Sequence, residues 1–67
     1  MEFAKTLKGI RKEKSMTQVQ LAMKLNVTDA TIRGWENRGS EPNYEMLCQI
    51  AKIFDVTVGQ LLGVEEY

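Results

Sequence analysis

The sequence contains no histidine, one cysteine and one proline among its 67 residues. Without histidine, acid–base catalysis by imidazole is excluded, and one cysteine cannot complete a structural zinc site. The lone Cys48 also excludes an internal disulfide, so we do not expect a secreted, disulfide-stapled fold. No apolar run reaches the roughly 20 residues that span a bilayer, and the N-terminal residues lack a stretch of signal-peptide length. We therefore expect a cytoplasmic protein with no membrane partner.

The composition favours one small globular domain. Hydrophobic residues make up 43% of the sequence, which is ordinary for a globular domain and too high for a disordered tail. A chain of this length lies near the lower limit of what a hydrophobic core can stabilise alone. No repeat, low-complexity tract or linker divides the chain, so residues 1–67 are predicted to form a single domain.

The formal net charge is zero, but the charges are unevenly distributed along the chain. Residues 1–40 hold eight basic and four acidic side chains, whereas residues 41–67 hold one basic and five acidic side chains. A chain with this asymmetry can meet phosphate groups with its first part. The alternative interpretation is that both parts are simply solvated helix faces.

Apolar residues recur with helical spacing, and no apolar/polar alternation persists long enough for a strand. Thr17 with Gln20, and Thr57 with Gln60, have the spacing of capping boxes that begin helices. Thr28 and Asn43 are the other predicted N-caps, and Gly63 is a predicted stop. The predicted helices are residues 2–14, 18–25, 29–37, 44–54 and 58–62.

Only Asn26, Val27 and Thr28 separate the second and third predicted helices. Asn26 tolerates the left-handed backbone conformation that a sharp turn requires. Two helices joined by such a short turn pack at a steep angle, which is typical of a helix-turn-helix. We therefore predict this motif at about residues 17–37.

A helical wheel divides the third predicted helix into two faces. Ile32 and Trp35 face the core, and the wheel places Thr28 on the same side. The opposite face is small or polar, and such a face can approach the floor of the DNA major groove. The alternative is an ordinary solvent-exposed face. This opposite face consists of Asp29, Ala30, Arg33 and Asn37, with Gly34 near its border.

Three further residues receive structural interpretations. Trp35 could stack on single-stranded nucleic acid, but its phase with Ile32 favours the core. Cys48 lies beside the apolar stripe of the fourth helix, which favours a half-buried packing residue over a redox sensor. Met23 and Met46 are also predicted to pack.

Together these residues resemble the phage repressor/Cro-type helix-turn-helix proteins, also called the XRE family. The resemblance covers nearly the whole chain, and its motifs are specific in combination rather than singly. The matching segments are LKGIRKEK (7–14), MTQVQLA (16–22), VT (27–28), TIRGWEN (31–37), EPN (41–43), LCQIAKIFDV (47–56) and LL (61–62).

The resemblance implies an all-α, five-helix, lambda-repressor-like domain and a set of site residues. It implies that Gln18 contacts phosphate and supports the recognition helix, and that the loop after this helix grips the DNA backbone. It also implies an internal ion pair between Arg11 and Glu36, for which the alternative is a weak surface pair. The implied DNA-binding residues are Gln18, Thr28, Asp29, Ala30, Arg33, Gly34, Asn37, Arg38 and Ser40.

The sequence departs from the family pattern at two helix ends. The family often has glycine directly after the "EN" pair, whereas here Arg38 precedes Gly39, so we expect the helix stop to shift by one residue. The family often has glycine where this chain has Asp55, which can also adopt the left-handed conformation.

We therefore expect a sequence-specific regulator of transcription that binds double-stranded DNA and acts as a repressor, of bacterial, phage or mobile-element origin. The alternative is a protein-interaction module, such as an antitoxin-like or anti-repressor-binding domain. An enzyme is not expected, because the sequence has no nucleophile–base pair and no phosphate-binding glycine loop. We expect no cofactor, metal or small-molecule ligand.

One short recognition helix reads few base pairs, so we also expect a homodimer on DNA. Its predicted contact is the C-terminal end, through Leu62, Val64 and Tyr67, with Leu61 in the core. The alternative is that Leu62 and Val64 complete the core of the monomer.

Overall fold

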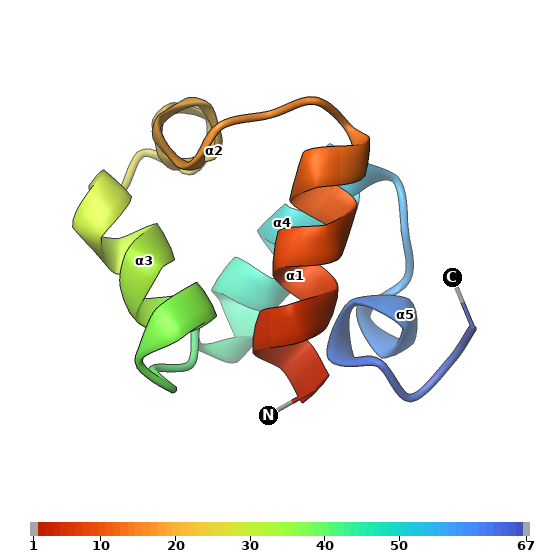
Figure 1. Cartoon of the computed structure of the whole chain (residues 1–67). Coiled ribbons are helices and arrows are strands. Elements are labelled where there is room, and N and C mark those ends of the chain that lie inside the picture. The colour runs from red at the N-terminus through yellow and green to blue at the C-terminus, as the bar shows by residue number, and fades with distance from the viewer. Residues whose placement is uncertain (1, 67) are drawn as a thin grey trace.

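The computed structural model describes residues 2–66, which form five helices and no strand (Figure 1). In Figure 1, α1 crosses in front of α4, α3 and α5 lie on opposite sides of this pair, and α2 lies above α3, joined to the end of α1 by a loop. This is the all-α, five-helix arrangement predicted from the sequence. No helix within residues 2–66 is long and apolar enough to cross a membrane. The helices are α1 (Glu2–Glu13), α2 (Gln18–Leu25), α3 (Asp29–Asn37), α4 (Tyr44–Phe54) and α5 (Val58–Leu62).

Four of the helices begin at the predicted N-caps. The Thr17 hydroxyl accepts from the Gln20 backbone N–H at 3.0 Å, and the Gln20 Oε1 accepts from the Thr17 N–H at 2.8 Å. Thr57 and Gln60 form the same reciprocal box at the start of α5. Asn43 Oδ1 accepts from the third backbone N–H of α4 at 2.9 Å. Each cap satisfies N–H groups that have no partner within the helix, so these short helices begin at defined residues.

Left-handed residues other than glycine follow three of the helices, and left-handed glycines follow the other two, with Gly63 ending α5 as predicted. Asn26 and Asp55 have φ of 59° and 57°, as predicted for the ends of α2 and α4. Ser15, with φ of 57°, was not predicted to adopt this conformation. It reverses the chain so that the Met16 N–H donates to the Arg11 carbonyl at 3.1 Å. For this reason α1 ends one residue earlier than predicted.

The core contains residues from all five helices. Trp35 is buried, as predicted, and Cys48 and Met46 are half-buried. Met23 is 76% exposed, so the prediction that it packs is wrong, because it projects from the outer side of α2. The largest fully buried side chains are Leu7, Leu21, Ile32, Ile50, Phe54 and Leu61.

Candidate nucleic-acid interface

The short connection between α2 and α3 sets where α3 begins. Thr28 caps α3 through its hydroxyl, which accepts from the Thr31 N–H at 3.2 Å. The wheel placed Thr28 on the core side, and this is wrong, since Thr28 is exposed. Its backbone is extended, with φ of −84° and ψ of 156°, so a helical wheel does not apply to it. The exposed Thr28 therefore lies at the start of the outer face of α3.

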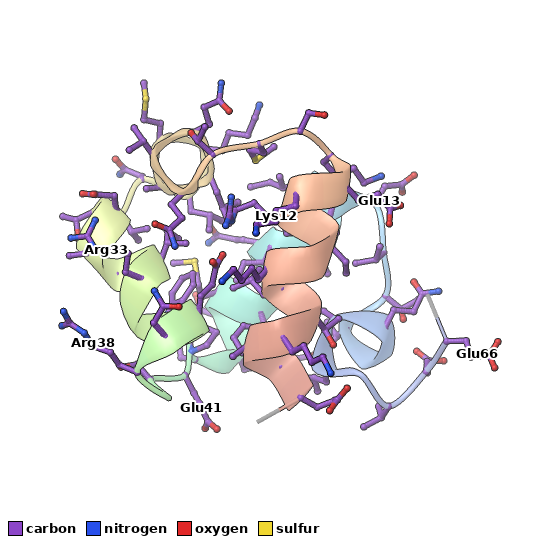
Figure 2. All side chains as sticks on the ribbon, viewed as in Figure 1. Lys12, Glu13, Arg33, Arg38, Glu41 and Glu66 are labelled. Atoms are coloured by element: carbon purple, nitrogen blue, oxygen red, sulfur yellow. The ribbon has the colours of Figure 1, made fainter. Side chains whose placement is uncertain are left out.

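The outer face of α3 is built from small and polar side chains. Ala30 and Asn37 are exposed, whereas Ile32 and Trp35 on the opposite face are buried. Figure 2 shows Arg33 and Arg38 projecting from α3 and its end on the side away from α1. A helix with this division presents a narrow surface that is free of bulky apolar groups.

Arg33 and Asp29 lie one turn apart on this face and form an ion pair. Arg33 Nη1 donates to Asp29 Oδ2, and both side chains keep 44–45% of their surface exposed. The hydrogen bond and the positive charge of Arg33 hold the pKa of Asp29 below its ordinary value. The face therefore carries one fixed positive and one fixed negative charge, side by side.

Gly34 does not lie on the exposed face, which corrects the prediction that it borders that face. It is buried, because the chain after α3 turns back over it. The Gly34 carbonyl accepts from the N–H groups of Arg38 at 3.0 Å and Ser40 at 3.2 Å. A Cβ added to Gly34 would lie 3.3 Å from the Ser40 Oγ. Gly34 therefore allows the loop to pack closely, and its place is beneath the surface.

The loop after α3 has the predicted shift in its stop. Arg38 follows α3 with φ of −121°, and the next residue, Gly39, has φ of 77°. The left-handed residue is thus one position later than the usual glycine. Arg38 and Ser40 are both exposed at this end of α3.

A buried polar network joins α1, α2 and α3. Arg11 Nε lies 2.7 Å from Glu36 Oε2, and Arg11 Nη2 donates to Glu36 Oε1 at 3.1 Å. Gln18 Nε2 also donates to Glu36 Oε1 at 3.1 Å, and Arg11 Nη1 donates to the Met16 carbonyl at 2.8 Å. Within residues 2–66, every buried side-chain nitrogen and oxygen atom has a hydrogen-bond partner. Because Glu36 belongs to α3, this network fixes the angle of α3 against the other two helices.

The network also places Gln18 at the edge of the candidate interface. Its side chain is half-buried, and Nε2 carries a second N–H besides the one that reaches Glu36. The resemblance implied that Gln18 supports the recognition helix, but the sequence did not identify Glu36 as its partner, because the contact joins two helices whose angle is set only by packing.

Two hollows lie outside the face of α3. One of about 390 Å³ lies beside α2 and is lined by Lys14, Ser15, Met16, Gln20, Met23 and Lys24. The other, of about 220 Å³, is lined by Phe3, Glu41, Pro42, Leu47 and Leu62. The sequence did not reveal either hollow, because each joins residues from separate elements.

The predicted dimer surface is partly formed by core residues. Leu61 is fully buried, as predicted, and Leu62 packs partly against the core. Val64 is 78% exposed. Tyr67 lies outside the described residues. Of the three predicted contact residues, Val64 is thus the one that the structure shows to be widely exposed.

Comparison with known proteins defines the class of this fold and site. Residues 7–61 match the helix-turn-helix family. The chain therefore belongs to this helix-turn-helix family of the XRE type, which confirms the resemblance seen in the sequence.

Two bacterial relatives span nearly all of this chain. It is 44% identical over 66 residues to the HTH-type transcriptional activator BcrR of Enterococcus faecalis, covering 98% of this chain and 32% of that protein. It is 38% identical over 63 residues to the HTH-type transcriptional regulator YqaE of Bacillus subtilis (strain 168), covering 94% of this chain and 54% of that protein. The chain thus spans between about a third and about half the length of these relatives.

A solved structure shares the fold. The crystal structure of FeII HppE matches with a TM-score of 0.82 and 34% sequence identity, over 90% of this chain and 32% of that chain. The iron belongs to that protein. Among residues 2–66 of this chain, no three His, Cys, Asp or Glu side chains are grouped so that they could hold a metal ion. The similarity therefore concerns the helical fold of this chain, which corresponds to 32% of that chain.

Proposed function

We propose that this chain binds double-stranded DNA in a sequence-specific manner and regulates transcription. The observation that carries this proposal is the outer face of α3, whose side chains are small or polar, with Ala30 and Asn37 exposed and Asp29 and Arg33 partly exposed. Such a helix fits the major groove, where an arginine can donate two hydrogen bonds to guanine O6 and N7. We assign that role to Arg33. The relatives, which are named as transcriptional regulators or activators, support the same role for this chain.

Residues at the two ends of α3 hold the DNA backbone in this proposal. Thr28 lies at its start, Arg38 and Ser40 lie just beyond its end, and Gln18 is hydrogen-bonded to Glu36 in its last turn. The second amide N–H of Gln18 is available to a phosphate oxygen, and Arg38 adds a positive charge. Such contacts position a protein on the duplex without reading sequence. Gly34 has no part in the contact surface, because it is buried.

Selection from a random-sequence duplex library tests this proposal. Once a preferred duplex is found, Arg33→Ala should weaken binding to it by about 1–3 kcal/mol and remove the preference at one base position. Arg38→Ala, which removes the same charge from the loop, should weaken binding to all sequences alike. If both variants lose affinity evenly across sequences, Arg33 contacts only phosphate. If no duplex is enriched, the sequence-specific proposal is wrong.

We further propose that two copies bind one operator, since a single α3 reads few base pairs. The exposed Val64, beside the partly buried Leu62, supports a contact at the end of α5. Sedimentation with the selected duplex should give two chains per duplex at saturation, and Val64→Glu should reduce this pairing. One chain per duplex would contradict the dimer.

The sign of regulation is a separate question. Repression stays a prediction, because one relative is named as an activator.

A protein-interaction role is the second candidate function, and it is favoured by the exposure of Val19 and Met23 on α2. A protein in this second role would show little affinity for duplex DNA at low salt, which separates the two candidates.

A further inference from the structure

The ion pair on the outer face of α3 has unused hydrogen-bonding capacity. Arg33 Nη1 donates one N–H to Asp29 Oδ2, and an arginine guanidinium has five N–H groups in one plane. Asp29 Oδ1 remains an acceptor, because an ionised carboxylate can accept several hydrogen bonds through its two oxygens. With 44–45% of each side chain exposed, both groups are accessible from outside the protein. The pair thus combines further donors on Arg33 with an acceptor on Asp29, so it can present two donors followed by one acceptor.

This order of groups is complementary to one kind of base-pair edge. In the major groove a G·C pair presents the acceptors N7 and O6 of guanine and then the N4–H donor of cytosine. We propose that Asp29 and Arg33 act together as a reader of a single G·C pair in one orientation, with Arg33 on guanine and Asp29 on the cytosine N4–H. This inference rests on the proposed function, in which α3 lies in the major groove.

The other base pairs do not match this order. An A·T pair places the adenine N6–H donor opposite an arginine donor and the thymine O4 acceptor opposite the carboxylate. A C·G pair presents the matching groups in reverse order. At the A·T and C·G pairs the Asp29 charge approaches the DNA phosphates without a donor to accept from, and this disfavours binding. A T·A pair keeps an acceptor and a donor, thymine O4 and adenine N6–H, at the positions of guanine O6 and cytosine N4–H, so there it is Arg33 that discriminates, because the thymine methyl replaces the N7 acceptor. Asp29 therefore acts as a specificity-determining residue that disfavours incorrect sequences.

Asp29 also restricts the movement of the Arg33 side chain. A free arginine side chain can swing toward the phosphates of any sequence, which raises affinity without selectivity. Paired with Asp29 along the helix, the guanidinium stays over the outer face of α3. Removal of Asp29 should therefore increase affinity for incorrect duplexes and decrease discrimination between base pairs.

The test uses the duplex obtained by selection from the random library, at the base pair where Arg33→Ala removes the preference. The wild-type protein should prefer G·C there by roughly 10-fold or more over each other pair. Asp29→Ala should bind the A·T and C·G duplexes several-fold more tightly and reduce the preference over these two pairs several-fold. Replacing the cytosine by N4-methylcytosine, which blocks the major-groove N–H, should weaken the wild-type complex and leave the Asp29→Ala complex unchanged.

Glu45→Ala is the matched control, because Glu45 is also an exposed acidic residue in the first turn of a helix, here α4. It removes the same charge and should leave the preference unchanged. If the wild-type protein selects a sequence and Asp29→Ala keeps the full preference and the sensitivity to N4-methylcytosine, this inference is overturned while the proposed function stands. If no duplex is selected, the proposed function and the inference both fail.

Discussion

Arg33 controls the ionisation of its neighbour Asp29 on the outer face of α3. Its hydrogen bond and positive charge lower the pKa of Asp29, so the carboxylate is ionised at neutral pH. An acid with a lowered pKa in the folded protein contributes stability above its ordinary pKa. That contribution is lost as the pH falls through the lowered value. The ion pair is therefore complete at neutral pH and breaks only in acid.

Arg33→Ala should raise the pKa of Asp29 back toward the ordinary aspartate range, because both main causes of the shift disappear. An NMR titration of the Asp29 carboxyl carbon measures this pKa directly. Arg38→Ala, which removes a charge at the far end of α3, should leave it unchanged. If the pKa of Asp29 is the same in the wild-type protein and in Arg33→Ala, the ion pair does not form in solution.

The sequence predicted part of this face correctly. Ala30 and Asn37 are exposed because they lie opposite Ile32 on a regular helix, and a wheel describes such positions. It fails for Thr28, whose backbone is extended. It also fails for Gly34, whose burial depends on a loop that returns from outside the helix.

At the level of helices, the Arg11–Gln18–Glu36 network fixes α3 to α1 and α2. Glu36→Ala should destabilise the fold by about 3–5 kcal/mol, because it leaves the Arg11 charge buried without its partner. A domain of this size has a total stability of the same order. Replacing both charged residues by apolar ones, as in Arg11→Met/Glu36→Leu, should cost less than Glu36→Ala alone.

Urea unfolding followed by circular dichroism measures these changes. Glu41→Ala is the control, because Glu41 is an exposed acid in the loop before α4 and its loss should change stability by less than about 0.5 kcal/mol. A Glu36→Ala loss as small as that of Glu41→Ala would mean that the network does not hold α3.

Replacing glycine by alanine at Gly39, after α3, and at Gly9, within α1, tests the left-handed backbone conformation at Gly39. Gly39 has φ of 77° and open space around its missing Cβ, so Gly39→Ala should cost about 1 kcal/mol through backbone strain alone. Gly9 lies exposed within α1, also with open space, so Gly9→Ala should stabilise by about 0.5–1 kcal/mol. Thermal unfolding of both variants should show opposite shifts. Shifts in the same direction would contradict the left-handed conformation at Gly39.

The helices themselves were largely predictable, because their limits depend on local chemistry. The caps at Thr17, Thr28, Asn43 and Thr57 use side chains within three residues of the groups they bond. The end of α1 was not predictable in this way, since Ser15 adopts a conformation that serine rarely takes. Contacts between helices, such as that of Gln18 with Glu36, also required the three-dimensional structure.

For the whole molecule, the uneven distribution of charge is consistent with the proposed DNA contact. The candidate interface belongs entirely to residues 1–40, which hold eight basic and four acidic side chains. In Figure 2, Glu66 of the later part lies on the side of the molecule opposite to Arg33 and Arg38. A net charge of zero therefore does not argue against binding to a polyanion, because the charge that matters is local.

The salt dependence of binding to duplex DNA tests the central claim most directly. Each phosphate neutralised by the protein releases counterions, so log K should fall linearly with log salt, with a slope of about −0.9 for each phosphate. With several phosphate contacts from each of two copies, we predict a slope of about −4 or steeper. An affinity that does not change with salt, or no binding to any duplex at about 50 mM salt, would contradict the account.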